Sequence, residues 1–272
     1  MAETARRRRP FSIRRQPGFA TVAALCFVIL YLPITVLVVY SFNAGVSIAV
    51  WEGFSLRWYA HAWQNDAVQE ASIRSLIIAA SASVISTVVA TMAALATTRT
   101  APFRGATVVY AMINQPLMVP AIVTGVALLI VFSQIRVATG YYGLGYLIIA
   151  HTAFCIPFAY LPIRARLENM DLSLERAAAD LYATPWLTFR RVTLPLMLPG
   201  IMAGAMLAFV ISLDEVVITE FVKSSGQDTL PTYMLGQIRR AVSPEINAIS
   251  TVFLAISVLI VTIFFFFSRR RP

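Results

Sequence analysis

The stretch LERAAADLYATPWLTFRRVTLPLMLPG, residues 174–200, places a charged, helix-forming insert between two strongly apolar segments. Four of its apolar residues recur at i, i+3, i+4 and i+7, the spacing of one helix face: Leu174, Ala177, Ala178 and Leu181. By the same spacing, the residues that face away from this stripe are Glu175, Arg176, Ala179 and Asp180. The pattern predicts a short amphipathic helix whose first turn is capped by the hydroxyl of Ser173.

A second helix is expected directly after the first. Thr184 supplies a capping hydroxyl, and Pro185 occupies the first helical position, where its missing N–H costs nothing. We expect this helix to end before Pro195, because the residue that precedes a proline disfavours the helical conformation. The sequence therefore predicts a helix–turn–helix over 173–193, inside a polar loop at 167–198.

The composition around this loop is that of a membrane protein. The chain is 58% hydrophobic and 13% charged, whereas soluble domains carry about 25% charged residues. The first apolar segment lacks a small-residue cleavage site and is too long for a removed signal peptide, so we expect it to stay as an anchor. We predict an all-α integral membrane protein with one domain, 19–267, and six transmembrane helices long enough to cross ~30 Å of hydrocarbon: 19–42, 72–96, 106–132, 144–166, 199–222 and 246–267.

The arginine distribution predicts the orientation of these spans. With the N-terminus inside, 16 of the 22 basic residues lie in cytoplasmic segments, among them a basic N-terminus at 1–18 and a basic tail at 268–272. This excess is the positive-inside signature of a multi-pass protein with both termini in the cytoplasm. The net charge of +9 therefore reflects topology, and we expect no nucleic-acid partner. The basic residues left outside are Arg57, Arg74, Arg136, Lys223, Arg239 and Arg240.

No motif in the chain predicts catalysis. Cys26 and Cys155 lie in different spans, and His61 and His151 are isolated in the sequence, so neither pair has metal-ligand spacing. The only lysine, Lys223, is not part of a phosphate-binding loop. We expect no enzymatic activity, no metal site and no cofactor bound by this chain.

Two carboxylates lie inside the fifth predicted span. Asp214 and Glu215 are about 15 residues into it, hence ~22 Å from its cytoplasmic start. We expect Asp214 to point about 100° away from Glu215, as for successive helical residues. A small, polar stripe suited to a water-filled passage comprises Ala208, Ser212, Glu215 and Thr219. Such carboxylates attract ammonium groups, or they pair with Arg74 or Arg136, and the sequence leaves both alternatives open.

Three interpretations of the polar loop compete. A DNA-binding helix–turn–helix is disfavoured because tethering at both ends leaves no room for a supporting domain. A structural pair of surface helices remains possible. The third interpretation is a docking element for a cytosolic partner, since an apolar stripe with exposed charges suits a helix-in-groove contact.

The loop resembles the EAA loop of ABC importer membrane subunits. Ala177 and Ala178 match its two alanines, and Leu194-Pro195 matches its L-P. Arg176 occupies the usual glutamate position, with Glu175 one place earlier, and Tyr182 replaces the usual glycine of the turn. Three longer strings look like the spermidine/putrescine branch of the family: WEGFSLRWYAHAW (51–63), SLDEVVITEFV (212–222) and VSPEINAISTVFLAISVLIV (242–261).

The resemblance implies a coupling loop that docks on a separate ATPase. The implied assembly contains a second homologous permease subunit, two cytosolic ATPase subunits that bind ATP and Mg²⁺, and a periplasmic substrate-binding protein, in the lipid of a bacterial inner membrane. The implied substrate is spermidine, putrescine or a related organic cation. An importer for another small substrate (an amino-acid-derived compound, an opine, a metal or an anion) and a gradient-driven secondary transporter remain open.

The residues expected to couple to the ATPase are Glu175, Arg176, Ala177, Ala178, Asp180, Leu181, Tyr182, Ala183, Pro185, Trp186, Leu194 and Pro195. The residues expected along the substrate pathway are Ser212, Asp214, Glu215 and Thr219.

Overall fold

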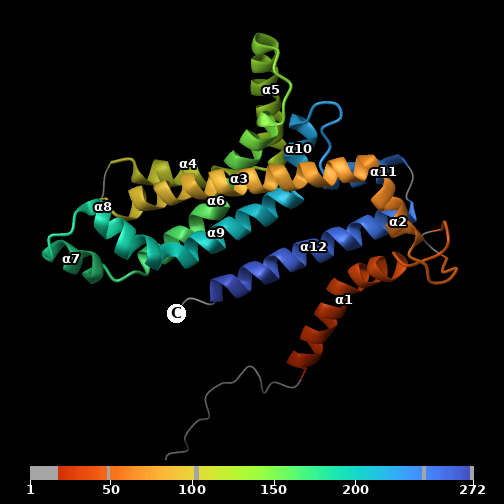
Figure 1. Cartoon of the computed structure of the whole chain (residues 1–272), viewed down its shortest axis with the longest axis horizontal. Helices are drawn as coiled ribbons and strands as arrows, with labels where there is room; N and C mark the ends of the chain where they lie inside the picture. The colour runs from red at the N-terminus through yellow and green to blue at the C-terminus, as the bar shows by residue number, and fades with distance from the viewer. Residues whose placement is uncertain (1–17, 48–49, 101–103, 241–242, 270–272) are drawn as a thin grey trace, which may run out of the picture.

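The computed structural model describes residues 18–47, 50–100, 104–240 and 243–269, and these are almost entirely helical (Figure 1). The predicted basic segment before residue 18 and the last three residues of the tail lie outside this part. The helices are α1 (Phe19–Tyr40), α2 (Arg57–Gln64), α3 (Asp66–Thr98), α4 (Ala106–Met118), α5 (Ala121–Thr139), α6 (Gly145–Glu168), α7 (Ser173–Asp180), α8 (Pro185–Thr188), the π-helix η2 (Phe189–Thr193), α9 (Leu194–Asp214), α10 (Val217–Val222), α11 (Leu230–Arg240) and α12 (Pro244–Arg269).

Six helical segments are long and apolar enough to cross a membrane, as the sequence predicts. They contain α1, α3, α5, α6, the run from α8 to α9, and α12. Most of the long helices run side by side along one axis, with α7 and α8 at one end and α2 and α11 at the other (Figure 1). The all-α membrane fold is therefore confirmed.

The third predicted span, 106–132, is not one continuous helix. It divides into α4 and α5, and α5 projects steeply from the body of the molecule (Figure 1). Val119 is extended, with φ −95° and ψ 131°, and Pro120 follows it. Proline lacks an N–H and disfavours the helical conformation of the residue before it, so this pair of residues breaks the helix.

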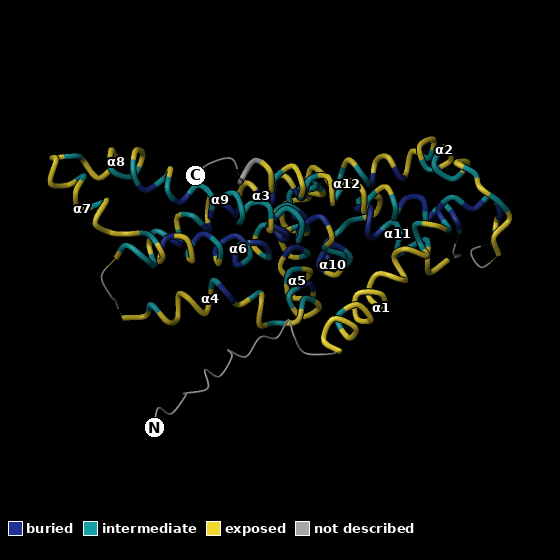
Figure 2. Tube along the Cα trace, turned by 90° about the horizontal axis from the view of Figure 1, so that it is seen from below, coloured by how far each residue is buried: buried dark blue, intermediate teal, exposed yellow. Residues whose placement is uncertain are grey.

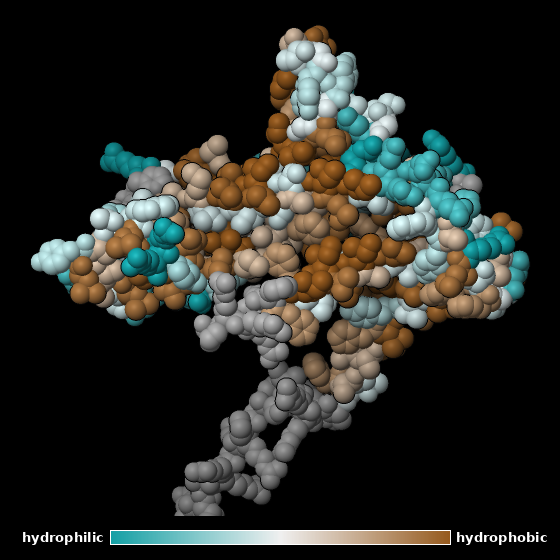
Figure 3. All heavy atoms as spheres, viewed as in Figure 1, coloured by the Kyte–Doolittle hydropathy of each residue, from teal (hydrophilic) through white to brown (hydrophobic). Residues whose placement is uncertain are grey.

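The core lies where α3, α6 and α9 pack together, and Figure 2 shows the buried residues concentrated there. Small side chains form much of this contact, including Ala90 and Ala94 of α3, Ala159 of α6 and Ala208 of α9. Small residues let helix backbones approach closely, which is how membrane helices gain packing energy. By contrast, α1 has no buried residue, and broad apolar surfaces remain exposed on the outside (Figure 3).

The second helix of the loop does not end before Pro195, contrary to the prediction. The chain stays helical from Pro185 to Asp214, passing through η2. In η2 the N–H of Leu194 donates to the carbonyl of Phe189, five residues back. The ring of a proline clashes with the carbonyl four residues before it in an α-helix. We attribute the tolerance of Pro195 to the wider π-turn that immediately precedes it.

We predict that Gly204→Ala destabilises the protein, because α6 and α9 cross closely at this glycine. A Cβ there would lie 2.7 Å from the backbone oxygen of Ala159, which cannot move as a side chain does. We expect the free energy of unfolding to fall by about 1–3 kcal/mol, seen as a lower melting temperature in detergent. Gly236→Ala is the control, since nothing lies within 4 Å of its added Cβ. Equal melting temperatures for the two variants would contradict the tight crossing.

Candidate functional site

The polar loop folds into a hairpin of α7 and α8 at one end of the molecule (Figure 1). The turn between them is left-handed at Tyr182, with φ 60°, the only positive φ at a non-glycine residue in the described ranges. Tyr182 N–H donates to Ala179 O, and Ala183 N–H donates to Ala178 O. These two bonds form the Schellman motif that normally ends in glycine. Tyr182 therefore adopts the turn of the glycine it replaces, at a cost of about 1–2 kcal/mol.

The two helix starts are capped differently from one another. Thr184 caps α8 as predicted, its hydroxyl accepting from the N–H of Leu187 at 3.3 Å. Ser173 does not cap α7. Instead the carboxylate of Asp171 accepts from the N–H of Ser173 at 2.8 Å. Hydrogen bonding from the side chain of Ser173, and then from its backbone N–H, lowers the pKa of the Asp171 carboxyl below its usual value. The first turn of α7 is therefore capped by an anion, which the positive end of the helix dipole favours.

The tip of the hairpin exposes large apolar side chains beside charged ones (Figure 3). Tyr182 is 96% exposed, Leu181 82% and Trp186 68%. Ala177 and Pro185 are exposed too, as are the charged Arg176 and Asp180, while Ala178 and Ala183 are partly covered. Exposed apolar groups rimmed by charge mark interaction surfaces. Leu194 and Pro195 lie away from the tip, at the start of α9.

Glu175, which the sequence places off the apolar stripe of α7, contacts the bundle. Its Oε1 accepts from Arg99 Nε at 3.1 Å and from Thr193 Oγ1 at 2.9 Å. Arg99, directly after α3, also donates from Nη1 to the carbonyl of Leu167 at 3.2 Å. Glu175 thus ties α7 to the ends of α3 and α6 and to η2. The hairpin is anchored to the bundle by this carboxylate.

The second site is the break between α9 and α10. Asp214 ends α9, and Glu215 leaves the helical conformation, with φ −72° and ψ 113°. Both residues line one pocket of about 190 Å³, with Phe154 and Phe158 of α6 and with Val210 and Ile211 of α9. The 100° spacing expected for successive helical residues assumed a continuous helix, and the helix ends at Asp214.

The two basic residues considered as partners bind elsewhere. Arg74 lies 3.6 Å from the carboxylate of Glu70 and donates to the carbonyl of Asp228. Arg136 donates to the carbonyl of Val222 and lies over the rings of Tyr142 and Tyr146. None of the ion pairs among the described residues includes Asp214 or Glu215. Within this chain, neither Arg74 nor Arg136 forms an ion pair with Asp214 or Glu215.

Of the four positions in the predicted polar stripe, only Glu215 lines the pocket. Ala208, Ser212 and Thr219 are buried against other helices. The hydroxyls of Ser212 and Thr219 each lie 2.8 Å from a ring nitrogen of His151, which is also buried. Sequence reasoning treated His151 as isolated. Its position in the middle of a predicted span was the available signal, since polar side chains inside membranes find partners.

Comparison with known proteins gives a family and several relatives. The profile of the family described as "Binding-protein-dependent transport system inner membrane component" matches residues 86–271. The putrescine transport system permease protein PotI of Escherichia coli is 40% identical over 243 residues, covering 88% of this chain and 86% of the relative. The spermidine/putrescine transport system permease protein PotC of Haemophilus influenzae is 35% identical over 242 residues, covering 89% of this chain and 93% of the relative.

Two solved structures share the fold at low sequence identity. A bacterial ABC transporter involved in the import of the acidic polysaccharide alginate aligns with a TM-score of 0.72 and 15% identity, covering 93% of this chain and 94% of that one. The MetNI methionine ABC transporter, in an inward-facing conformation, aligns with a TM-score of 0.62 and 19% identity, covering 72% of this chain and 92% of that one.

We predict that Glu175→Gln loosens the hairpin. The carboxylate and Arg99 are each only 20% exposed, so removing the charge leaves a shielded guanidinium with a weaker partner. We expect the free energy of unfolding to fall by about 1–3 kcal/mol, measured as a lower melting temperature in detergent. Glu168→Gln removes a comparable ion pair, with Arg164, at a carboxylate that is 50% exposed. This control should change stability by less than about 0.5 kcal/mol. Equal effects of the two substitutions would argue against the anchor.

Proposed function

The chain belongs to the family of binding-protein-dependent transport system inner membrane components, and from this membership we propose that it forms the translocation pathway of an ATP-driven importer for putrescine, spermidine or a related organic cation. It is a multi-pass membrane transport subunit and not an enzyme. The observation that carries the substrate class is the pocket in which Asp214 and Glu215 meet two phenyl rings.

The chemistry of this pocket suits an alkylammonium ion. Its carboxylates offer charge-assisted hydrogen bonds to N–H donors, and the rings of Phe154 and Phe158 offer π faces to a cation. Val210 and Ile211 provide apolar contact for the carbon chain between amino groups. A carboxylate inside a bilayer costs about 2.5–3.5 kcal/mol on insertion scales. A passing cation offsets that cost only while it is bound, which suits transport.

The hairpin is proposed to dock on a cytosolic ATPase subunit. Its exposed apolar tip provides a contact for a groove, and the charged residues around it provide orientation. In this proposal, ATP and Mg²⁺ bind only to two separate ATPase subunits. A second homologous permease completes the membrane pair, and a periplasmic binding protein delivers the substrate.

One helical run connects the hairpin to the pocket. The 30 residues from Pro185 to Asp214 are helical throughout and extend ~45 Å. Glu175 clamps the hairpin end of this run to α3 through Arg99. Closure of the ATPase subunits would therefore move the hairpin, α3 and α9 together, and change the side of the membrane to which the carboxylates are accessible.

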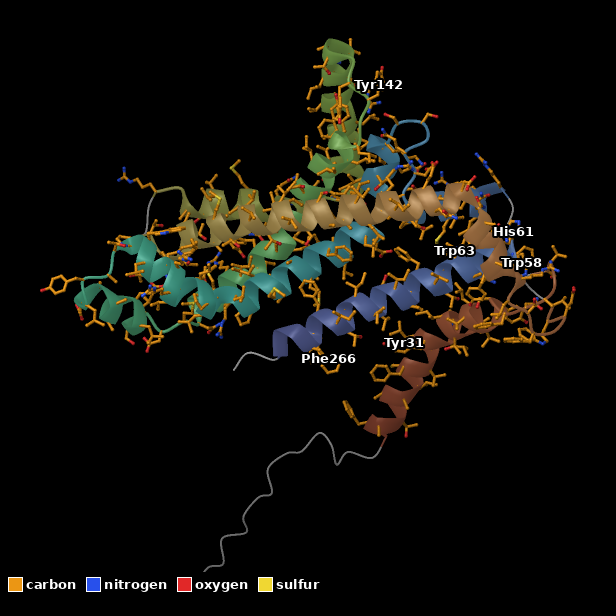
Figure 4. The ribbon with its side chains drawn as sticks, in the orientation of Figure 1. Tyr31, Trp58, His61, Trp63, Tyr142 and Phe266 are labelled. Carbon is orange, nitrogen blue, oxygen red and sulfur yellow. The ribbon has the colours of Figure 1, made fainter. Side chains whose placement is uncertain are left out.

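The proposed orientation places the hairpin in the cytoplasm of a bacterium, with the chain in its inner membrane and both termini inside. Arg99 and Arg166 lie close to the hairpin end, in contact with Glu175 and Leu196 respectively. At the opposite end, Trp58, His61 and Trp63 project from α2 (Figure 4). Tryptophans are common at membrane interfaces, and this end would face the binding protein.

We predict that Ala177→Asp abolishes coupling without preventing membrane insertion. The exposed Ala177 lies on the apolar stripe of α7, and a buried charge in a docked interface would be poorly solvated. Uptake of radiolabelled putrescine by cells that contain the complete transporter should fall at least about 10-fold. Ala179→Asp, on the opposite face of the same helix and also exposed, should transport within about two-fold of the unmodified protein. Normal uptake by Ala177→Asp would count heavily against docking at this face.

We predict that Asp214→Asn and Glu215→Gln each reduce transport by about 10- to 100-fold, because each removes a charged partner of the ammonium group. The measurement is ATP-dependent putrescine uptake into proteoliposomes, with the binding-protein affinity for putrescine measured separately. Glu220→Gln is the control, because Glu220 pairs with Lys223 at 2.6 Å and does not line the pocket. Wild-type uptake by both pocket variants would exclude the pocket from the pathway.

A further inference from the structure

His151 bridges the break between α9 and α10. Its Nδ1 lies 2.8 Å from the hydroxyl of Ser212, in the last turn of α9, and its Nε2 lies 2.8 Å from the hydroxyl of Thr219, in α10. All three residues are buried. One imidazole on α6 therefore holds the chain on both sides of Asp214 and Glu215.

The contacts of Thr219 favour one tautomer of this imidazole. Thr219 Oγ1 lies 2.8 Å from the carbonyl of Glu215, which can only accept a hydrogen bond. With the hydroxyl proton on this carbonyl, Thr219 accepts from His151, and the ring proton lies on Nε2. Nδ1 is then the acceptor, and the hydroxyl of Ser212 donates to it. In this tautomer each ring nitrogen is paired: Nε2–H donates to the Thr219 hydroxyl, and Nδ1 accepts from the Ser212 hydroxyl, as in a neutral imidazole.

The bridge leads to the backbone of Glu215, one of the two acidic residues of the pocket. From His151 Nε2–H, the chain of hydrogen bonds runs through the Thr219 hydroxyl to the backbone carbonyl of Glu215. The side chain of Glu215 is held from the other direction, because its Oε1 accepts from the N–H of Ile218 at 2.9 Å. Backbone groups freed by a helix break inside a membrane need such partners. His151 thus supports both the break and the orientation of Glu215.

We infer that His151, as its Nε2–H tautomer, is a positioning residue for transport, which holds the α9–α10 break so that Asp214 and Glu215 face the substrate pocket. The inference rests on the proposed function of that pocket. His151 does not line the pocket itself, and it acts on the cation through the carboxylates.

Two amide variants separate the two halves of the bridge. The amide of His151→Gln reaches the region of Nε2 and keeps a donor for Thr219, whereas that of His151→Asn reaches only the region of Nδ1 and keeps an acceptor for Ser212. In proteoliposomes that hold the complete transporter, putrescine uptake should fall at least about 10-fold for His151→Asn and less than about three-fold for His151→Gln. Cys155→Ala is the control, since Cys155 is buried one turn along α6 and its thiol donates to the carbonyl of Ala208, outside the bridge.

A second pair of variants tests the middle link without changing the histidine. Thr219→Val removes the hydroxyl at nearly constant volume, and Thr219→Ser keeps it. Thr219→Val should reproduce the loss seen with His151→Asn, while Thr219→Ser should keep uptake within about three-fold of the unmodified protein. Equal uptake by Thr219→Val and Thr219→Ser overturns the inference, and so does equal uptake by His151→Gln and His151→Asn. This holds even where all four variants assemble poorly.

The readout that separates positioning from general stability is the reactivity of position 215. Glu215→Cys, in a background of Cys26→Ser and Cys155→Ala, is labelled by a cationic thiosulfonate reagent in the assembled transporter. Adding His151→Asn should slow this labelling about 10-fold, because the side chain turns away from the pocket. An unchanged labelling rate overturns the inference.

The transport data separate this inference from the proposed function. If Asp214→Asn and Glu215→Gln transport normally, the proposed pathway fails. If they fail to transport and His151→Asn transports normally, only the positioning role fails.

Discussion

The close crossing of α6 and α9 at Gly204 is the contact on which both proposed sites depend. A glycine allows the backbone of α9 to lie against Ala159, where a Cβ would come within 2.7 Å of the carbonyl oxygen. Between this crossing and the α9–α10 break, α6 places His151 against the break and places Phe154 and Phe158 in the lining of the pocket. The spacing between these helices sets the depth and composition of the pocket.

The arrangement separates the exposed hairpin from the pocket while keeping them in one mechanical unit. The π-turn at Phe189–Thr193 lets Pro195 remain in a continuous helix, so no flexible joint intervenes between Pro185 and Asp214. Beyond Asp214 the helix breaks, and His151 connects the two sides of the break through the hydroxyls of Ser212 and Thr219. Rigidity at one end of α9 and an irregular backbone at the other are what a lever with a binding site at its tip requires.

The sequence similarity and the pocket chemistry support the same class of substrate by independent routes. PotI and PotC carry putrescine and spermidine/putrescine in their names. The two solved structures, an alginate and a methionine ABC transporter, show only that the fold is shared. In the proposed pathway, the features that suit a cation are two acidic residues and two phenylalanines in one pocket, with Arg74 and Arg136 bonded elsewhere.

The sequence by itself determined the features that depend on neighbours along the chain. Hydropathy predicted six spans, the i, i+3, i+4 pattern predicted α7, and Thr184-Pro185 predicted the start of α8, because each signal arises within a few turns of helix. Only the tertiary structure decided which polar groups meet. Glu175 turns inward because Arg99 lies 76 residues away in sequence but beside it in space. Asp214 and Glu215 share a pocket, and His151 finds Ser212 and Thr219, because α6 packs along α9 as far as the point where the helix breaks.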